Sequence, residues 1–331
     1  MVVPTLLRAF FVLASATILF IQSIPPFRSR FLAYGKVATP TTPNTKDAKP
    51  STTAAPQDSK TPITALLDHL AMYTVPHSFF THFYILALAT LFLLGQQIST
   101  HGPLYTLLRD LQAPEWAAAA GSARRAMGGQ SIHQVVLTWT CLVLQAGRRL
   151  YECLFVQKEK ETVTKRGEGS RMSVAHYALG LAFYVCVSVG GWVEGTDAID
   201  AFKFTLMNVY SLVGPPSAKS FIGVMFFIIG SGIQHDCHTY LTSLEKYTLP
   251  THPAFQKLVC PHYFAECLVY LGLTIMSAPR GRGPFNVTMW TALIFVGVNL
   301  GVTSMLNREW YVGKFGEKSM EGRWNMIPLL F

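Results

Sequence analysis

Apolar runs of about twenty residues, separated by short polar stretches, recur along this chain of 331 residues. An α-helix of that length spans about 30 Å, which is the thickness of the hydrocarbon core of a bilayer. We therefore predict an all-α fold, a polytopic membrane bundle of about seven transmembrane helices. The predicted spans cover residues 6–24, 79–98, 135–154, 174–193, 221–233, 263–276 and 287–306.

The first span has some features of a signal peptide, because Arg8 precedes its apolar stretch and Pro25 and Pro26 follow it. Its apolar part is longer than a typical signal core, and no small-residue cleavage site follows it cleanly. We predict that it is retained as the first membrane helix.

Three segments are expected from the composition. Residues 1–36 hold the first helix and its flank, and residues 72–331 form the membrane domain. Between them, residues 37–71 are rich in Ser, Thr, Pro and Lys, a composition that buries too little apolar surface to fold alone. We expect a disordered loop there.

The overall composition agrees with a membrane environment. Hydrophobic residues make up 50% of the chain, charged residues 14%, and the mean hydropathy is +0.31. The net charge of +9 comes from basic residues beside apolar runs, so no nucleic-acid partner is expected. The six cysteines form no CxxC pair, so no disulfide framework is predicted.

The distribution of basic residues predicts the orientation in the membrane. Lys and Arg concentrate in cytosolic connections of membrane proteins. With a lumenal N-terminus, nineteen of the 27 basic residues fall in cytosolic segments, and the C-terminus is cytosolic. All the polar clusters described next then lie near the cytosolic face, where a soluble nucleotide cofactor would arrive.

The first cluster lies at the end of the third predicted span, where Arg149 and Glu152 are three residues apart and so share a helix face. A charge near the hydrocarbon is costly, which favours a functional ion pair. In the alternative interpretation, Arg148 and Arg149 only anchor the helix at the headgroups.

The second cluster, residues 234–238, follows the apolar part of the fifth span and contains His235, Cys237 and His238. This spacing is a weak zinc pattern. A polar helix end that lines a cofactor pocket is the other interpretation, and we expect no metal.

The third and fourth clusters lie near the C-terminus. Pro261 is suited to a helix start, and His262 and Glu266 then lie four residues apart on one face, as either a functional pair or a polar contact between helices. In the tail, Arg308 and Arg323 could bind either dinucleotide phosphates or lipid headgroups.

No GxGxxG after a strand, GxxxxGK[ST], HExxH or GxSxG motif is present, so a bound nucleotide would not use a Rossmann domain. The ordered set of clusters nevertheless resembles the steroid 5α-reductase family, most closely its polyprenol reductase branch. The resemblance rests on residues 74–85, the double-arginine segment 148–154, the segment 234–238, the segment 260–266 and the closing segment 310–328. It covers roughly residues 30–36 and 72–331.

The resemblance implies an endoplasmic-reticulum membrane reductase that uses NADPH and a long-chain isoprenoid lipid, polyprenol or polyprenal, in dolichol biosynthesis and so supports protein N-glycosylation. Arg149 and Glu152 would organise the inner pocket, and Glu266 would serve catalysis, with Tyr263, Tyr151 or His82 as the acid. The residues implied to hold NADPH are Arg149, His238, Lys246, His262, Asn307, Arg308, Tyr311 and Arg323.

Three positions depart from the family pattern. His262 replaces an Asn, Glu245 replaces a basic residue, and Ala146 stands where the steroid enzymes carry a catalytic tyrosine. The proton donor and steroid specificity are therefore not carried over. A membrane methyltransferase of the isoprenylcysteine type and a non-enzymatic lipid transporter or scaffold are the competing interpretations.

Overall fold

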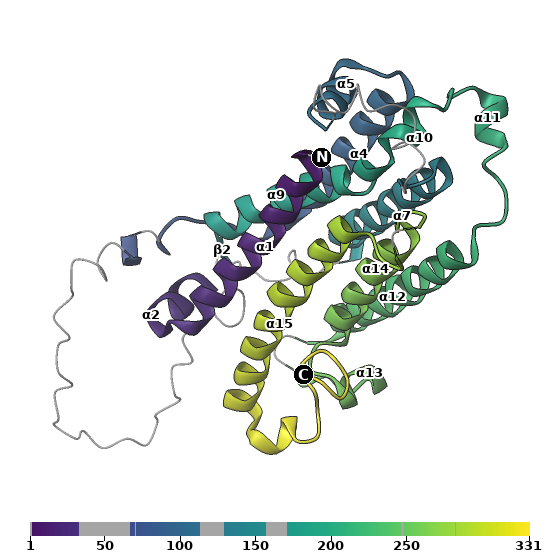
Figure 1. Cartoon of the computed structure of the whole chain (residues 1–331). Helices are drawn as coiled ribbons and strands as arrows, with labels where there is room; N and C mark the ends of the chain where they lie inside the picture. Colours follow the sequence, from purple (N-terminus) through teal and green to yellow (C-terminus); the bar gives the residue numbers. More distant parts are fainter. Residues whose placement is uncertain are drawn as a thin grey trace, which may run out of the picture.

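The computed structural model describes residues 2–32, 67–69, 71–112, 129–156, 171–245, 248–281 and 283–331. Within these residues, one long helix corresponds to each predicted span (Figure 1). These are α1 (Val2–Ser23), α4 (Phe80–Ser99), α7 (Ile132–Tyr151), α9 (Val174–Gly190), α12 (Ala218–Ser243), α14 (Pro261–Met276) and α15 (Val287–Phe315). The predicted loop 37–71 lies outside the described residues except for 67–69 and 71.

Five of these helices, α1, α4, α9, α12 and α15, are long and apolar enough to cross a membrane. The protein is thus a largely helical, multi-pass membrane protein. The other two are less clear candidates, because α14 has only 16 residues and α7 ends with Arg148 and Arg149. The predicted total of seven spans stays a prediction for these two helices.

Short elements connect the long helices. The two strands β1 (Thr74–Pro76) and β2 (Arg171–Ser173) pair antiparallel and bring the starts of α4 and α9 together. The remaining elements are α2 (Pro25–Phe27), η1 (Arg28–Leu32), η3 (His77–Phe79), α5 (Pro103–Asp110), η4 (Glu152–Val156), η5 (Val193–Gly195), α10 (Thr196–Asp200), α11 (Leu206–Tyr210), α13 (Pro253–Lys257) and η6 (Glu317–Met320).

Two helices extend further than predicted. Helix α12 continues ten residues past the predicted end of its span, so the cluster 234–238 lies within the helix instead of after it. Helix α15 continues nine residues past Leu306 and carries Asn307, Arg308 and Tyr311. In both cases the polar side chains find partners on neighbouring elements, so a drop in hydropathy does not mark the end of the helix.

Glycines allow α12 and α14 to pack with their backbones in close contact. A Cβ atom at Gly230 would lie 2.7 Å from the carbonyl oxygen of Ala265, and one at Gly272 would lie 2.5 Å from that of Gly223. Small residues at helix contacts are a common means of close packing in membranes. This contact fixes the cluster on α12 relative to the cluster on α14.

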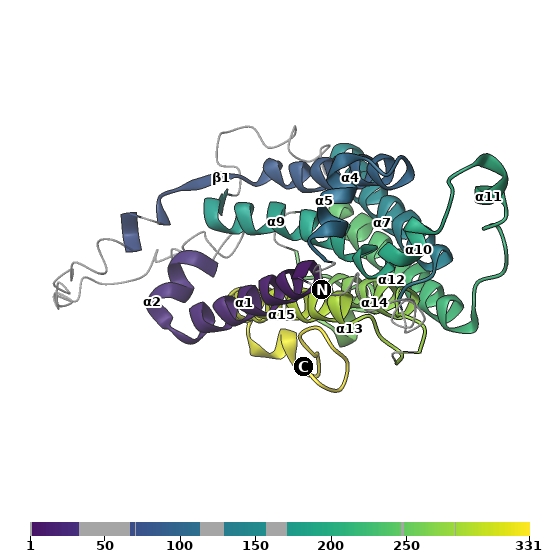
Figure 2. The same ribbon diagram turned by 45° about the horizontal axis from the view of Figure 1, so that its top comes forward.

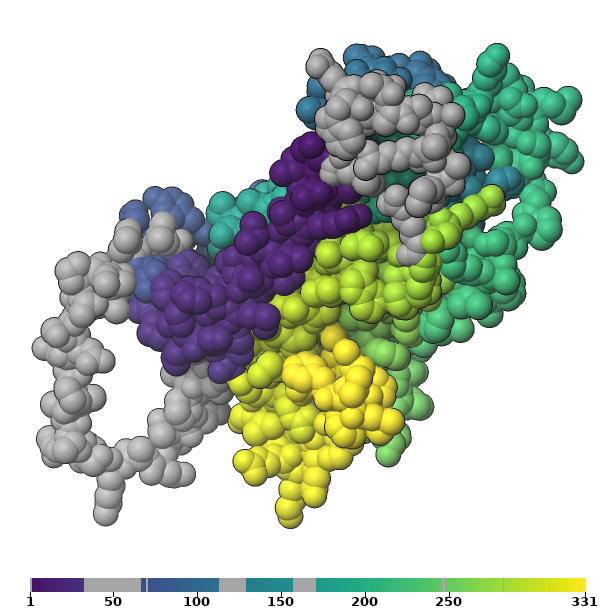
Figure 3. Space-filling model, in the orientation of Figure 1, coloured from purple at the N-terminus to yellow at the C-terminus, as the bar shows by residue number. Residues whose placement is uncertain are grey.

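The first helix packs along α15, as Figures 1 and 2 both show, and the purple α1 follows the yellow-green α15 across one face of the molecule in Figure 3. Phe11 is fully buried, with ring centroids 5.9 Å from Phe183 and 6.4 Å from Phe295. Arg8 forms an ion pair of 2.9 Å with the buried Glu194. Helix α1 is therefore part of the folded core.

Candidate active site

Polar side chains from three helices meet where α7 and α12 end and α14 begins. Arg149 on α7 contacts Nδ1 of His238 on α12 at 2.7 Å. Gln145, one turn earlier on α7, donates hydrogen bonds to Gln234 at 3.0 Å and to Glu266 of α14 at 3.3 Å. The first three predicted clusters, which are far apart in the sequence, thus form one site.

Glu152 is the centre of the charged part of this site. Its carboxylate is fully buried and forms ion pairs with both Arg148 and Arg149, as the i, i+3 spacing of Arg149 and Glu152 predicted. Nδ1 of His235 lies 2.7 Å from one carboxylate oxygen, and Nδ1 of His238 lies 2.8 Å from the other. A buried carboxylate is tolerated when it is paired and fully hydrogen-bonded, so Glu152 can hold Arg149 and His238 in fixed positions.

Glu266 belongs to a neighbouring amide network. Its carboxylate accepts hydrogen bonds from the side-chain amides of Gln145 and Gln234. Arg148 in turn donates to the amide oxygens of both glutamines. The two networks share Arg148, and this link ties Glu266 to the Glu152 cluster.

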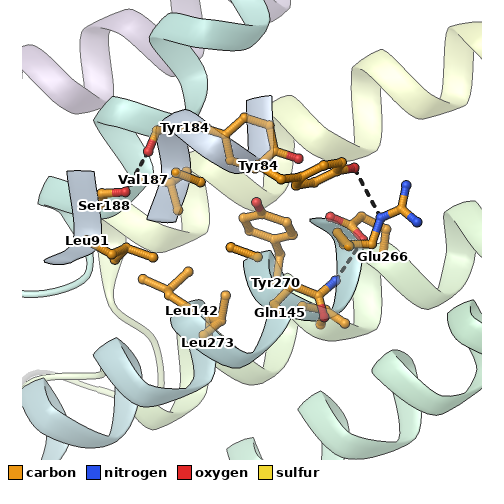
Figure 4. Close-up of a pocket in the computed structure, with 14 residues that line it drawn as sticks. Tyr84, Leu91, Leu142, Gln145, Tyr184, Val187, Ser188, Glu266, Tyr270 and Leu273 are labelled. Carbon is orange, nitrogen blue, oxygen red and sulfur yellow. Dashed lines mark hydrogen bonds between the residues drawn. The ribbon is translucent and has the colours of Figure 1, made fainter. Parts of the chain in front are cut away.

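Three tyrosines lie above this network and surround a small inner cavity of about 20 Å³ (Figure 4). Tyr84 accepts a hydrogen bond of 3.1 Å from Nε of Arg149, and its ring packs edge to face against Tyr184 with the centroids 5.4 Å apart. Tyr270 and Glu266 line the same cavity. This volume has room for about one water molecule.

A larger cavity of about 160 Å³ lies beside the inner one and shares four lining residues with it. One wall is polar and comes mainly from α7, α12 and α14. The lining residues from α4, α9 and α15 are mostly apolar and form the other wall. The polar lining residues are Tyr84, Arg149, His176, Tyr184, Gln234, His238, His262, Tyr263, Glu266 and Asn299, and the apolar ones are Phe80, Phe83, Leu179, Gly180, Phe183, Phe295, Val296 and Leu300.

The polar wall has the donor set that a nicotinamide carboxamide requires. Gln234 has an amide, and His238 and Arg149 have ring and guanidinium nitrogens, which would share their present bonds to Glu266, Glu152 and Tyr84 with a ligand. Next to this wall, Nε of Arg148 is buried and has no hydrogen-bond partner among the described residues. A buried donor of this kind is costly unless water satisfies it, because Arg148 itself lines neither cavity. The donors that do line the cavity fit the nicotinamide end of a dinucleotide.

The tail arginines bind backbone carbonyls of the tail and of α13. Arg308 donates to the backbone carbonyls of Arg323 at 2.6 Å and Met320 at 3.0 Å. Arg323 donates to the carbonyl of Phe255 at 2.9 Å. The resemblance implies that these arginines hold phosphates. To do so, their guanidinium groups would have to exchange or share those hydrogen bonds.

The other two predicted tail residues lie near the cavity's Tyr263. The side-chain amide of Asn307 is 3.5 Å from the hydroxyl of Tyr263. Tyr311 is buried in a small cluster with Cys260 and Met320. This cluster joins the C-terminal segment to the start of α14, so the tail braces the site.

Besides Glu152 and the four tail residues, which do not line the cavity, three more predicted residues lie away from it or outside the described residues. His82 is exposed, and its Nδ1 lies 2.9 Å from the hydroxyl of Tyr177. Tyr151 is also exposed and packs against Phe155. Lys246 lies outside the described residues.

The weak zinc pattern has another structural explanation. His235 and His238 both face Glu152, and Cys237 is a buried free thiol. In the parts of the chain that the structure describes, no three His, Cys, Asp or Glu side chains are grouped as metal ligands. None of the six cysteines forms a disulfide.

A family comparison agrees with the sequence resemblance. Residues 171–331 match the family model described as 3-oxo-5-alpha-steroid 4-dehydrogenase. This match covers 161 residues in the C-terminal part of the chain. That region contains α9, α12, α14 and α15, and so supplies both His238 and Glu266 of the site.

Several proteins named polyprenal reductase are similar to the chain over most of their length. The chain is 29% identical to a protein named polyprenal reductase from Xenopus laevis over 279 residues, 79% of each chain. It is 26% identical to polyprenal reductase 1 from Oryza sativa subsp. indica and 26% identical to polyprenal reductase from Homo sapiens, over 78% of this chain and 80% and 79% of theirs. The family description and these names are those of oxidoreductases, and the resemblance to the steroid 5α-reductase family is confirmed.

Four residues of the site were not predicted, namely Tyr84, Gln145, Tyr184 and Tyr270. The direct contact of Gln234 with Glu266 was not predicted either. The tyrosines lie within long apolar runs, where an isolated aromatic residue is usually part of the core. Gln145 could have been assigned to the site from the sequence, because it lies four residues before Arg149 and so shares its helix face.

Proposed function

We propose that the protein is an NADPH-dependent reductase of the α-isoprene double bond of polyprenal. The observation that carries the proposal is the cavity with two unlike walls. Its polar wall, with Arg149, His238 and Glu266, suits a nicotinamide, and its apolar wall, with Phe183 and Phe295, suits an isoprenoid chain. The similarity to proteins named polyprenal reductase supports the same substrate.

The aldehyde is the better substrate on chemical grounds. Reduction of the α-isoprene unit adds a hydride to a carbon–carbon double bond, and an allylic alcohol has no place for the negative charge that results. In an α,β-unsaturated aldehyde, hydride addition at the β carbon moves that charge to the oxygen, where hydrogen-bond donors can stabilise it. The overall route would run from polyprenol through polyprenal to dolichol.

When bound, NADPH would supply the hydride. The chain's own residues position the two reactants and handle charge. Glu152 fixes Arg149 and His238, and Arg149 places a fixed positive charge beside the cavity. The apolar side chains exclude water from the reacting carbons, which strengthens these electrostatic effects.

The cellular setting is part of the proposal. The enzyme would lie in the endoplasmic reticulum membrane with its C-terminus and cofactor site on the cytosolic side, and its product would supply the lipid carrier for protein N-glycosylation. The excess of basic residues in alternate connections supports this orientation. The isoprenoid lipid and membrane lipids are the expected partners.

An assay of the purified protein tests the activity. We expect NADPH to reduce polyprenal to the saturated aldehyde and to reduce polyprenol more slowly or not at all. Faster reduction of the alcohol would overturn the choice of substrate. Thermal stabilisation by S-adenosylmethionine in place of NADPH would instead favour a methyltransferase.

Lipid analysis of cells that lack the protein tests the pathway. We expect polyprenol to accumulate, dolichol to become scarce and secreted glycoproteins to be under-glycosylated. Normal dolichol levels with defective lipid movement between leaflets would support a transporter instead.

A further inference from the structure

Tyr84 occupies the boundary between the two cavities. It is buried on α4 and lines both the inner cavity and the outer one. The inner cavity, at about 20 Å³, has room for a water molecule but not for an isoprene unit. A substrate must therefore lie in the outer cavity, with the Tyr84 side chain in the wall against it.

Arg149 makes this tyrosine different from its neighbours. Nε of Arg149 donates to the Tyr84 hydroxyl at 3.1 Å, and the centre of the guanidinium group is 5.0 Å from the centre of the ring. Burial opposes formation of a phenolate, while an adjacent cation stabilises one. Such a phenol keeps its proton at rest and can release it when negative charge develops in front of it.

The geometry favours Tyr84 over the other tyrosines of the site. The hydroxyl of Tyr263 accepts a hydrogen bond of 3.5 Å from the side-chain amide of Asn307, which is uncharged. Tyr184 lines both cavities too, where its ring packs against Tyr84 and its backbone carbonyl accepts from the Ser188 hydroxyl. Tyr84 lies in the wall of the outer cavity, and a guanidinium group contacts its hydroxyl directly.

We propose that Tyr84 is the general acid of the reduction, an inference that rests on the proposed function. As the β carbon accepts the hydride, the π electrons of the double bond move to form a bond between the α carbon and the carbonyl carbon. The carbonyl electron pair moves to oxygen, which takes the proton of Tyr84 and leaves a phenolate beside Arg149. The resulting enol becomes the saturated aldehyde when a proton is added at the α carbon and the oxygen loses its own. Water restores the proton of Tyr84.

A Tyr84→Phe variant tests the proposal. Because a positioned general acid contributes about 10²–10⁴-fold to a rate, we expect kcat for polyprenal to fall by that factor while the Kd for NADPH stays within about threefold of wild type. The solvent isotope effect on kcat should also change. Tyr184→Phe should cause a smaller loss, and Tyr210→Phe, on the distant and exposed α11, serves as the control for a lost hydroxyl.

Incorporation of a fluorotyrosine at position 84 keeps the ring and the hydroxyl, so it tests the proposal even if Tyr84→Phe does not fold. Its phenol loses the proton at lower pH, and we expect the alkaline limb of the kcat profile to move to lower pH. An unmoved limb, or a Tyr84→Phe enzyme that retains kcat within about threefold of wild type, would overturn the role of Tyr84. Failure of the wild-type protein to reduce polyprenal with NADPH would instead reject the proposed function.

Discussion

Arg149 and Tyr84 lie 65 residues apart in the sequence and are joined by a buried hydrogen bond of 3.1 Å between α7 and α4. The same guanidinium group forms an ion pair with Glu152 and contacts His238 on α12. One side chain thus connects three helices at the wall of the outer cavity. Its planar set of donors allows this, because Nε faces Tyr84 while Nη1 faces both Glu152 and His238.

An Arg149→Lys variant should therefore lose most activity although it keeps the charge. Lysine carries a single ammonium group, which cannot reproduce the separate contacts with Tyr84, Glu152 and His238. We expect kcat/KM for polyprenal to fall by about 10²–10³-fold, the range seen when a preorganised donor is lost. Steady-state kinetics with NADPH measure it.

The matched control is Arg148→Lys, at the adjacent position on the same helix. Arg148 also pairs with Glu152 but does not line either cavity. A larger loss of activity for Arg148→Lys than for Arg149→Lys would contradict the role given to Arg149.

Glu266→Ala and Glu266→Gln test the second network. Both remove the carboxylate that accepts from Gln145 and Gln234, but the glutamine variant keeps the size of the side chain and one acceptor oxygen. We expect Glu266→Ala to abolish activity without preventing membrane insertion, and Glu266→Gln to fold and retain NADPH binding with reduced kcat. Membrane fractionation measures insertion, cofactor titration measures NADPH binding, and turnover measures kcat. Undiminished turnover in Glu266→Ala would remove Glu266 from the mechanism.

Much of the fold could be predicted from the sequence, because a membrane span requires a long apolar run wherever it lies in the chain. The run lengths predicted all seven long helices, and Pro261 predicted the start of α14. The predicted end of α12 was wrong by ten residues, because hydropathy alone cannot distinguish a polar loop from a polar helix face that packs against other helices.

The site was predictable only where its residues are close in the sequence. The pairing of Arg149 with Glu152 follows from helical spacing. The contacts of Glu266 with Gln145, 121 residues away, and of Arg149 with Tyr84 depend on how the helices pack. Nothing in the local pattern distinguishes Tyr84 from a tyrosine of the apolar core.

The ion pair between Arg8 and Glu194 should contribute to the stability of the whole fold. Arg8 Nη2 lies 2.9 Å from a Glu194 carboxylate oxygen that also accepts from the Thr288 hydroxyl at 2.6 Å. Removal of one partner leaves the buried Glu194 without its cation, so Arg8→Met should destabilise the protein by about 3–5 kcal/mol. Thermal unfolding in detergent micelles measures the effect.

A double-mutant cycle with Glu194→Gln provides the control. If the pair is the cause, the double variant should be more stable than the sum of the two single losses predicts. Additive losses would mean that Arg8 and Glu194 act independently, and that another contact holds α1 on the bundle.

Gly230 and Gly232 offer a matched test of the packing between α12 and α14. Both lie on α12, and alanine in place of glycine favours a helix by about 1 kcal/mol at either position. A Cβ atom at Gly230 would lie 2.7 Å from the carbonyl oxygen of Ala265, whereas nothing lies within 4 Å of one at Gly232. Gly230→Ala should therefore lower the unfolding temperature, because backbone atoms must move apart by several tenths of an ångström, and overpacking typically costs about 1–3 kcal/mol. Gly232→Ala should leave the unfolding temperature unchanged or raise it.

Since Gln234 lies one turn beyond Gly230, the displacement in Gly230→Ala should also reduce turnover. An equal response of the two variants would show that the helices are not held in this register.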